Sequence, residues 1–535
     1  LWPTPDPPLH VRLAFSDSAA PDICERRWPG EPLMSTLADG RAVMDVHVPN
    51  SPELKGWILS WGDEVEVLEP RELRSVIADE LAHLKQSDLF REFRTIEGGQ
   101  SDVLQTSHGE VLNLCSNNYL GLAERTELAD AAAAALRDFG SGAGASRLVS
   151  GHMSVHGELE RRIAEFEGTE SALVFPTGYM ANLGAVTSLM GKEDVVFGDR
   201  LNHASLIDGC RLSGATFRAF RHRDLGRLED ALKRAASFRR RMIATDGLFS
   251  MDGDVADVKG LVELADRYDA ITLVDEAHAT GVIGASGRGV CEALDVEDRV
   301  DVRVGTLSKA VGCLGGFVAG SRDLIDLLRN RARTFIFTTG LPPAICASAI
   351  AALDIIQREP ELRARLCENV VFFRERLTEA FAERSGQANL GATESDPEGM
   401  TPPHRAKMPE CPLDVRAFRR NSDLPPLPEA SSTPETPGCV RQTASGESAI
   451  VTPIIPIIIG EAEEALRVAG ELLEAGILIP AIRPPTVPNG TSRLRASVMA
   501  THTEEQLTDA ARAVGNVCGF QRDHGRFPQS RSTRS

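Results

Sequence analysis

Short apolar runs alternate with helix-like segments through the middle of the chain. The runs are rich in Val, Ile and Leu, and they cover 171–176, 194–197, 242–246, 271–275, 302–305 and 316–319. Apolar residues recur at helical spacing between them. Repeated alternation of a buried strand with a helix is typical of a mostly parallel sheet covered by helices. The pattern therefore predicts an α/β fold, with strands in these runs, from about residue 107 to residue 350.

A smaller αβ domain is predicted after the large one. Its pattern gives a strand at 454–459, a helix at 461–475, a short strand at 477–479, and a last strand and helix within 493–517. We therefore assign 81–350 to an N-terminal segment and a large domain, 351–518 to a small C-terminal domain, and 519–535 to a tail.

One stretch inside the small domain lacks apolar periodicity. Residues 391–447 hold ten of the 31 prolines, among many Ser, Thr and Glu residues. Such a composition buries too little apolar surface to offset the entropy of ordering, so we expect a disordered insertion that loops away from the domain.

The first 80 residues form a predicted unit of their own. Apolar residues alternate along 9–15, 44–48 and 65–67, and helical spacing covers 51–61 and 70–86. Three motifs are specific: Arg27-Trp-Pro29, Trp57-Ile-Leu-Ser-Trp-Gly62 and Val67-Leu-Glu-Pro-Arg71. Through them, 9–80 resembles the C-terminal extension of WYL-domain transcriptional regulators. No helix-turn-helix or WYL core accompanies it, so we do not expect a regulator. Both a true fusion and a misplaced gene start explain this segment.

Composition excludes several classes of function. A net charge of −19 and a sequence pI near 5.2, with scattered basic residues, are unlike a nucleic-acid binder. The longest apolar stretch, 450–460, is too short for a membrane span and contains Pro453 and Pro456. The N-terminus has no secretory pattern, and the ten cysteines show no Cys-x-x-Cys spacing. We therefore expect a cytoplasmic protein without nucleic-acid, membrane or metal partners.

Lys309 is the strongest candidate for chemistry. It is the only charged residue between Arg303 and Arg322, in a chain with seven lysines. Apolar surroundings lower the pKa of an amine, which makes it a nucleophile toward an aldehyde near neutral pH. A surface lysine on a glycine-rich turn is the other interpretation. Taken alone, the position favours the surface lysine.

Asp275 ends the predicted strand before that of Lys309, and Glu276-Ala-His278 follows it. An aspartate in this place is often a turn former or a helix cap. A buried aspartate could instead keep a pyridine nitrogen protonated, which turns the ring into an electron sink.

A third feature is the passage from a strand into a helix at Phe175-Pro-Thr-Gly-Tyr-Met-Ala-Asn182. Gly178 and the first amides of a helix near Tyr179 would cradle a phosphate, although a packing glycine is the plainer alternative. Thr306 and Ser308 add hydroxyls beside Lys309, and Thr338 and Thr339 form a second small polar cluster. An aldehyde-bearing phosphate cofactor accounts for all of these, and no zinc-ligand spacing competes with it.

Long motifs then occur in order along the chain. They are Ser116-Asn-Asn-Tyr-Leu-Gly121, Ser141-Gly-Ala-Gly-Ala-Ser-Arg147, Gly151-His152 with His156, Asp199-Arg-Leu-Asn-His-Ala-Ser205, Thr245-Asp-Gly-Leu-Phe-Ser-Met-Asp-Gly253, Val274-Asp-Glu-Ala-His278, Gly287-Arg-Gly289 and Gly305-Thr-Leu-Ser-Lys309. Through them, the chain from about 84 to 517 without the insertion resembles the α-oxoamine synthase family of pyridoxal 5'-phosphate (PLP) enzymes. The resemblance implies the PLP-dependent transferase fold type I and a cytoplasmic homodimer with shared active sites.

The resemblance also implies a role for individual residues. Lys309 would bond to the cofactor and then serve as acid and base, Asp275 would hold the ring nitrogen, and His203 would stack on the ring. The other implied cofactor contacts are Ser250 and His278 on the ring oxygen, Gly178, Tyr179 and Thr306 at the phosphate, and Thr338 and Thr339 at the phosphate of a neighbouring subunit. The implied substrate contacts are Arg495 and Asn117 for the amino-acid carboxylate, and Arg91 and Thr486 for the acyl group.

Within the family, 479–488 and 492–495 look most like the branch that serves biotin biosynthesis. This implies a decarboxylative condensation of L-alanine with pimeloyl-CoA or pimeloyl-acyl carrier protein, giving 8-amino-7-oxononanoate. Glycine C-acetyltransferase and other α-oxoamine synthases share the lysine, aspartate and histidines, so these activities stay open as alternatives. A non-catalytic regulatory protein that keeps the PLP fold is the remote alternative.

Overall fold

The computed structural model describes residues 9–16, 19–25, 32–49, 52–61, 64–87, 89–107, 109–390, 439–442 and 448–519. The chain divides into two compact units, Leu1–Phe93 and Arg94–Ser535. Most of the insertion predicted at 391–447, and the tail from 520 onward, lie outside the described residues. The short described part of that insertion contains a strand, β15 (Val440–Gln442), which pairs with β16 (Ser448–Ile450). Three residues are too short for the pattern to have indicated this hairpin.

The first unit is an antiparallel sheet with helices, in the strand order β2-β3-β1-β4. Its elements are β1 (Leu9–Phe15), α1 (Ala20–Glu25), β2 (Leu33–Thr36), β3 (Ala42–Val48), α2 (Pro52–Leu59), β4 (Val65–Glu69) and α3 (Arg71–Gln86). Leu13 and Phe15 pack against Ile23 and Ile58 in its core. The alternating pattern identified three of these strands, whereas β2 is exposed along its whole length and carries no such pattern. The predicted border at residue 80 falls inside α3.

The second unit is built on a seven-stranded sheet in the order β10-β9-β11-β12-β13-β14-β8. Its strands are β8 (Ser171–Phe175), β9 (Val195–Asp199), β10 (Thr216–Phe220), β11 (Arg241–Asp246), β12 (Ala270–Asp275), β13 (Val302–Thr306) and β14 (Gly316–Gly320). Neighbours from β10 to β13 run parallel, and β14 runs antiparallel to both β13 and β8. The prediction of a mostly parallel sheet is confirmed, with β10 missed because this edge strand is half exposed.

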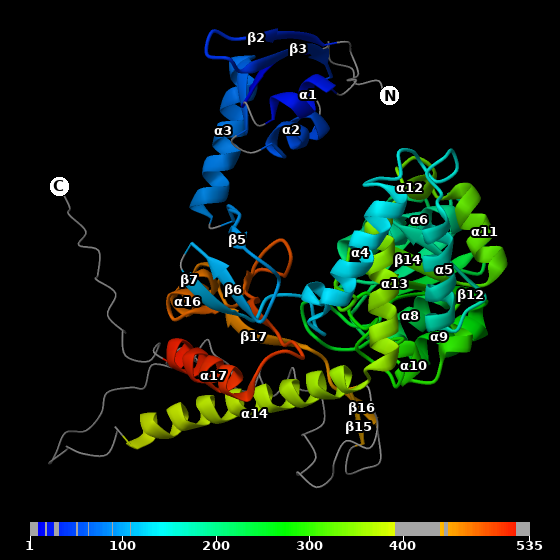
Figure 1. Ribbon diagram of the computed structural model, residues 1–535, viewed down its shortest axis with the longest axis vertical. Helices are drawn as coiled ribbons and strands as arrows, with labels where there is room; N and C mark the ends of the chain where they lie inside the picture. The colour runs from blue at the N-terminus through cyan, green and yellow to red at the C-terminus, as the bar shows by residue number, and fades with distance from the viewer. Residues whose placement is uncertain are drawn as a thin grey trace, which may run out of the picture. The chain divides into compact units, whose positions relative to one another are not determined.

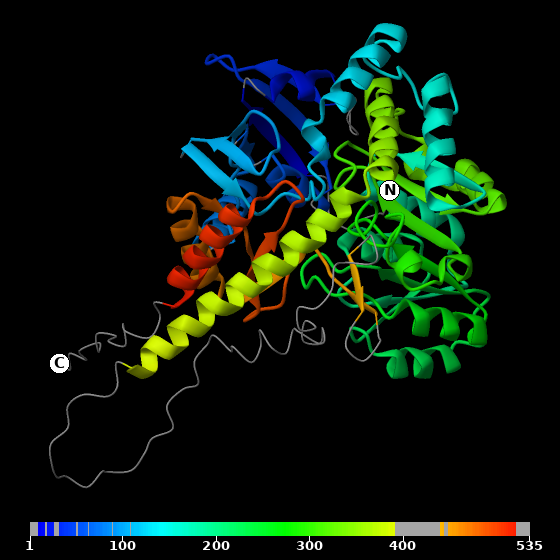
Figure 2. The same cartoon turned by 60° about the horizontal axis from the view of Figure 1, so that its bottom comes forward.

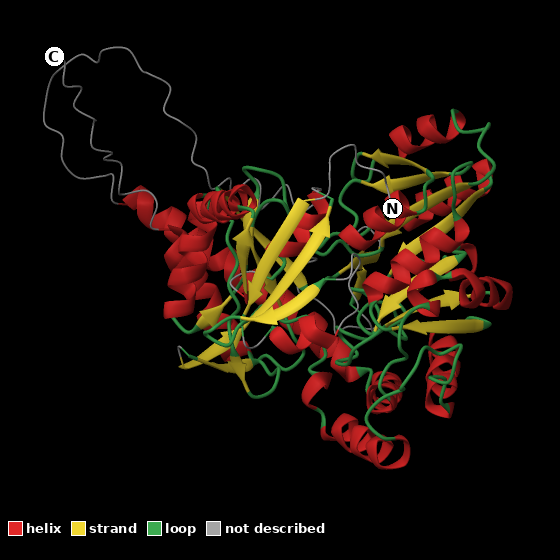
Figure 3. Ribbon diagram, turned by 90° about the horizontal axis from the view of Figure 1, so that it is seen from above, coloured by secondary structure: helices red, strands yellow, loops and turns green. Residues whose placement is uncertain are grey.

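Helices cover both faces of this sheet (Figure 1, Figure 3). Along β8, Leu173 and Phe175 enter one core while Ala172 and Val174 enter the other, so successive side chains alternate between two packed faces. The helices of this part are α4 (Thr126–Phe139), α5 (Ser154–Glu167), α6 (Gly178–Leu189), α7 (Ala204–Leu212), α8 (Leu225–Lys233), α9 (Val258–Tyr268), α10 (Val290–Ala293), α11 (Arg322–Arg331), α12 (Arg333–Ile336) and α13 (Pro343–Arg358), with 3₁₀ turns η2 (Leu122–Glu124) and η3 (Glu297–Arg299).

The remaining elements form two smaller sheets. One joins β5 (Ile96–Glu97), β6 (Val103–Thr106) and β7 (Gly109–Asn113) to β18 (Ile477–Leu478), so the segment before the large sheet completes the C-terminal part. The other has the order β17-β20-β19, from β17 (Ile454–Gly460), β19 (Ala481–Ile482) and β20 (Ser492–Ser497). Three helices accompany them, α14 (Glu361–Leu390), α16 (Ala462–Glu474) and α17 (Glu504–Gly519), and α17 lies along α14 (Figure 2).

Four parallel neighbours of the large sheet end in polar residues at one edge. The last residues of β9, β11, β12 and β13 are Asp199, Asp246, Asp275 and Thr306. Ligands of open α/β sheets bind at the carboxyl ends of the strands. This edge therefore positions the candidate site. Among the described residues, no helix is long and apolar enough to cross a membrane, and no group of His, Cys, Asp and Glu is arranged to hold a metal ion.

Candidate active site

Lys309 lies in the turn that follows β13, beside the carboxyl ends of the strands. Withdrawal of the amine from water lowers its pKa from 10.5 to about 8, although the charges of Asp275 and Asp246 act in the opposite direction. A measurable fraction of the side chain is thus a free amine near neutral pH. The glycine-rich turn places the amine inside the site, and the interpretation of Lys309 as an ordinary surface lysine is wrong.

Asp275 is buried at the end of β12, where its backbone pairs with Asp246 of β11. One carboxylate oxygen accepts a hydrogen bond from the Asn182 side-chain amide at 2.6 Å, and the other accepts from the Ala277 amide at 2.9 Å. The same Asn182 amide group also donates to the Ser205 hydroxyl at 2.9 Å. These two donors hold the carboxylate in one orientation.

Asp246 is a second buried carboxyl at this edge, which the sequence did not single out. Both of its oxygens accept from the His203 backbone amide, at 3.2 and 3.1 Å. Burial and the neighbouring charge of Asp275 raise its pKa well above the usual value. Asp246 therefore fixes the backbone that carries His203.

His203 stands at the start of α7, with its ring exposed. The ring shares a 2.8 Å hydrogen bond between Nδ1 and the Ser205 hydroxyl, and its edge meets the Tyr179 ring at 6.4 Å between centroids. Tyr179 itself donates a short hydrogen bond to Asp208. An imidazole held on one side and open on the other is suited to stack on a planar ligand.

The turn between β8 and α6 comes close to the turn after β13. The Thr177 hydroxyl caps α6 by accepting from the Met180 amide at 3.1 Å, so the helix begins at Gly178, one residue before the predicted start. A Cβ on Gly316 would lie 2.4 Å from the Gly178 nitrogen, and one on Gly178 would lie 3.3 Å from the Thr306 hydroxyl. A side chain at 316 would clash with the Gly178 backbone, and one at 178 would crowd Thr306. Because the first amides of a helix lack partners within it, this turn is suited to bind an anion.

A buried arginine network lies on the other side of the lysine. The Arg495 guanidinium donates to the Ser250 carbonyl at 2.6 Å, to the Asn117 side chain at 3.1 Å and to the Tyr119 hydroxyl at 3.3 Å. The Tyr119 hydroxyl also lies 2.8 Å from Nδ1 of His278. Burial, and then the positive charges of Lys309 and Arg495, lower the pKa of His278 well below its usual value, so its imidazole is neutral. A planar cation beside an amine is suited to an amino-acid carboxylate.

The predicted site residues divide into two groups. The first group is linked by hydrogen bonds or by electrostatic effects, and it contains Lys309, Asp275, His203, His278, Ser250, Asn117 and Arg495. Gly178 lies against Thr306. Thr338 and Thr339 belong to the second group. They line a small cavity together with Arg147 and His156. Thr486 is exposed after β19, and Arg91 is exposed in the first unit.

Sequence reasoning missed three contributors, Tyr119, Asn182 and Asp246. Each lies inside a motif that was recognised, but only the fold brings Asn182 to Asp275 and Tyr119 to His278 and Arg495. The signal for Asn182 was its place one helical turn into α6, on the side that faces β12.

Comparison with known families gives two matches. The Aminotransferase class I and II family matches residues 109–405 and 444–514. The WCX domain matches residues 7–84, which agrees with the resemblance of the N-terminal segment to the extension of WYL-domain regulators.

Two related proteins are 8-amino-7-oxononanoate synthases. The chain is 42% identical over 444 residues to the 8-amino-7-oxononanoate synthase of Geobacter sulfurreducens, covering 82% of this chain and 97% of that protein. It is 38% identical over 435 residues to 8-amino-7-oxononanoate synthase 1 of Bacillus velezensis, covering 81% and 95%.

Solved structures agree with the fold. A serine palmitoyltransferase of Sphingomonas wittichii is 29% identical, with a TM-score of 0.67, covering 84% of this chain and 98% of that one. A variant of the S. paucimobilis enzyme with a bound PLP–myriocin aldimine has the same identity and TM-score, covering 84% and 97%. The 8-amino-7-oxononanoate synthase of Francisella tularensis is 25% identical, with a TM-score of 0.55, covering 76% and 97%.

The residues at this edge fit PLP. The start of α6 carries no side chain at Gly178, the Asp275 carboxylate is fixed by two donors, and burial lowers the pKa of the Lys309 amine to about 8. The architecture is the PLP-dependent fold type I, with an extra domain at the N-terminus. With this site, and with a family match over most of its length, the chain belongs to the PLP-dependent aminotransferase class I and II family.

Proposed function

We propose that this chain is a PLP-dependent acyltransferase that condenses L-alanine with a pimeloyl thioester, releases carbon dioxide and yields 8-amino-7-oxononanoate for biotin biosynthesis. The observation that carries the proposal is 42% identity over 97% of a relative with that name. The linked Lys309, Asp275 and Arg495 supply the groups that such a condensation needs.

The cofactor would be held by Asp275, by His203 and by the turn between β8 and α6. When bound, PLP supplies an electron sink for the negative charge that forms at the amino acid Cα. Asp275 would keep the pyridine nitrogen protonated, because a fixed buried carboxylate favours the adjacent positive charge. His203 would stack on the ring, Ser250 and His278 would bond the ring oxygen, and Gly178, Tyr179 and Thr306 would contact the phosphate.

Arg495, Asn117 and Lys309 would handle the amino acid. A guanidinium binds a carboxylate through two parallel hydrogen bonds, and Asn117, which Arg495 contacts at 3.1 Å, would complete that subsite. Lys309 would carry the cofactor and then remove the proton from Cα of alanine, because its lowered pKa makes the free amine available as a base.

Arg91 and Thr486 are the residues we assign to the acyl donor. Both are exposed and polar, as suits contact with a thioester that arrives from solvent on CoA or on an acyl carrier protein. Turnover measured with each carrier decides between CoA and an acyl carrier protein.

We further propose a homodimer in which Thr338 and Thr339 reach the phosphate of the neighbouring subunit. Thr339 forms a backbone bridge with Ser146. Apolar side chains are exposed on both of these segments, namely Leu148 at 51%, Val149 at 79% and Phe337 at 70%. An apolar surface of this kind marks an interaction site, and a second copy would cover it. The cytoplasm stays the expected location, since the described cysteines are free thiols.

Steady-state kinetics would test the activity. Turnover of alanine with pimeloyl-CoA or pimeloyl-acyl carrier protein is expected to exceed turnover of glycine with acetyl-CoA. Activity with the second pair alone would reject the assignment in favour of glycine C-acetyltransferase. PLP binding without turnover of any such pair would favour a regulatory protein.

The variant Lys309→Ala tests the cofactor chemistry. The visible absorbance band of the bound cofactor should be lost, and turnover should fall by about 10³-fold or more, because the base is removed. Lys233→Ala is the matched control, because that lysine is 53% exposed on α8. An unchanged band in Lys309→Ala would contradict the role of Lys309.

A further inference from the structure

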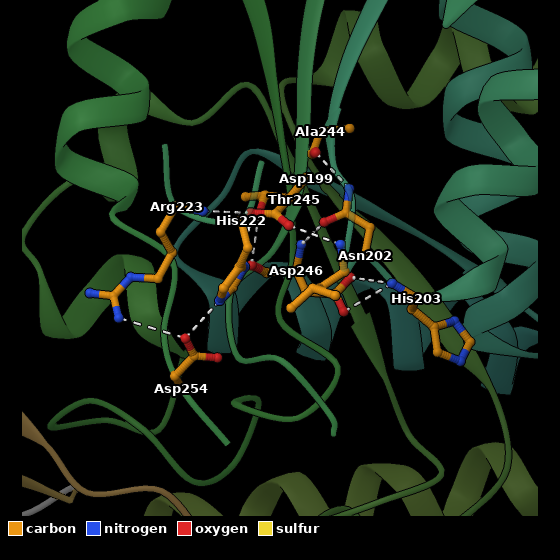
Figure 4. Close-up of polar contacts among 10 residues, drawn as sticks. Asp199, Asn202, His203, His222, Arg223, Ala244, Thr245, Asp246 and Asp254 are labelled. Atoms are coloured by element: carbon orange, nitrogen blue, oxygen red, sulfur yellow. Dashed lines mark hydrogen bonds and ion pairs between the residues drawn. The ribbon is translucent and has the colours of Figure 1, made fainter. Parts of the chain in front are cut away.

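His222 bridges two carboxylates behind the site. Nδ1 of its ring lies 3.0 Å from the Asp199 carboxylate, and Nε2 lies 2.8 Å from the Asp254 carboxylate (Figure 4). The edge of the ring meets the Phe249 ring at 4.5 Å between centroids. His222 follows β10, so it lies outside the residues that would touch the cofactor.

Asp199 organises the turn that leads to His203. One of its oxygens accepts from the Leu201 amide at 2.9 Å, and its carbonyl accepts from the Asn202 amide at 3.1 Å. Asn202 then accepts from the Asp246 amide at 3.2 Å, and Asp246 accepts from the His203 amide. A continuous path of hydrogen bonds thus runs from His222 to the residue that would stack on the ring (Figure 4).

Asp254 belongs to the loop between β11 and α9, which carries Ser250. Its carbonyl accepts from the Phe249 amide at 2.9 Å, which closes the loop on itself. From the other side, Arg495 holds the Ser250 carbonyl at 2.6 Å, and Thr452 donates to the Gly253 carbonyl at 2.6 Å. On the side of the large sheet, the contact of Asp254 with His222 holds the loop.

We propose that His222 is a positioning residue that ties the turn carrying His203 to the loop carrying Ser250, and so fixes the two against each other around the cofactor ring. The proposal rests on the proposed function only in that these two residues face PLP. The charged groups near His222 are Asp199 at the end of β9, Asp254 on the loop, and Arg223 in the turn after β10, whose guanidinium lies 3.6 Å from the Asp254 carboxylate.

The strength of the bridge from His222 to Asp199 and Asp254 is expected to depend on pH. Burial lowers the pKa of His222, but the hydrogen bonds and charges of Asp199 and Asp254 outweigh it and raise the pKa from 6.5 to about 9. A folded-state pKa above the unfolded value means that the imidazolium stabilises the fold fully below pH 6.5. This contribution declines as the pH rises and is lost through about pH 9.

The test compares the PLP-loaded wild type with His222→Gln, which removes the charge and keeps a hydrogen-bonding side chain. At pH 7.5 we expect kcat for alanine to fall about tenfold, with a smaller change in KM, because a misplaced ring site weakens the transition state more than binding. The ratio of wild-type to variant kcat should shrink toward one by pH 10. The absorbance and visible circular dichroism of bound PLP should differ between the two proteins at pH 7.5 and converge at pH 10, and so should their thermal midpoints.

Two further variants keep the result interpretable. Asp254→Asn should reproduce the spectral change, because it breaks the same bridge at the opposite end. Arg221→Gln is the matched control, because Arg221 is exposed one residue before His222; its kcat and spectrum should match the wild type. A PLP spectrum and a pH profile of His222→Gln that equal those of the wild type would overturn the proposal, even if thermal stability fell. If no substrate pair turned over, the PLP spectra and their dependence on pH would still decide for or against it.

Discussion

The two sides of the candidate site are built in different ways. On the cofactor side, Asp246, Asp275 and Thr306 end neighbouring strands of one sheet, and their exposed fractions are 3%, 5% and 4%. On the side that we propose for the acyl donor, Thr486 is exposed in a turn after β19.

The residues proposed to serve the chemistry are therefore held more firmly than those proposed to select the substrate. Strand ends in a packed sheet cannot move without disturbing two cores, so the groups that serve the cofactor are fixed. Surface turns tolerate change, so acyl selection can differ between relatives that keep the same lysine and aspartates. Substitutions on the two sides should therefore have effects of very different size.

The largest effect is expected for Asp275→Asn. The amide keeps the shape but loses the charge that would hold a proton on the pyridine nitrogen, so kcat should fall by about 10²- to 10³-fold. Kinetics with alanine and a pimeloyl thioester measure it, and Asp257→Asn on the exposed cap of α9 is the control. A fall of less than threefold would place the cofactor elsewhere.

The second-largest effect is expected for Arg495→Lys. Lysine keeps the charge but cannot donate to the Ser250 carbonyl, Asn117 and a substrate carboxylate together. KM for alanine should rise about 30-fold, the size expected when a charged hydrogen-bonded partner is lost from a buried site. Titration with alanine measures the change, with Arg467→Lys on the surface of α16 as control. An equal rise in the two variants would remove Arg495 from the amino-acid subsite.

Loading of the apoenzyme with PLP should depend on pH. Because the free amine of Lys309 is the reactive form, the loading rate should rise about tenfold from pH 7 to pH 9, as the lysine loses its proton around pH 8. Growth of the visible band after PLP addition measures this rate. A rate that is flat across that range would mean that the amine is not the group that limits capture.

The smallest effect is expected for Thr486→Ala on the acyl side. Loss of one hydrogen bond at an exposed position should raise KM for the pimeloyl thioester about three- to fivefold and leave KM for alanine unchanged. Thr378→Ala on the exposed face of α14 is the matched control. A change as large as that of Arg495→Lys would mean that the acyl side is as firmly built as the cofactor side.

The sequence pattern predicted the repeated units of the large sheet, in which a strand alternates with a helix. Six of the strands in the large sheet, and the strand ends at Asp275 and beside Lys309, follow from short apolar runs that alternate with helices. The antiparallel insertion of β14 between β13 and β8 does not follow, because a run of apolar residues says nothing about strand direction. The exposed strand β2 was missed for a related reason, since it has no buried face to leave a pattern.

The site was predictable where one residue acts alone, and less so where residues act together. Lys309 and Asp275 were identified from their positions, and the other roles from family resemblance. Asn182, Tyr119 and Asp246 act through partners far away in the sequence, such as His278 for Tyr119. Only the folded chain brings such partners within hydrogen-bonding distance.

The place of β14 in the sheet has a consequence for how the protein is made. β8 leads into the turn before α6, and its neighbour in the sheet is β14. Phe175 therefore pairs with Gly316, which lies far along the chain. Pairing between such distant segments is slow. A nascent chain halted before β14 would already contain Asp246 and Asp275 but would lack Gly316, which lies against the Gly178 amide. We therefore expect capture of the cofactor only after β14 has joined the sheet.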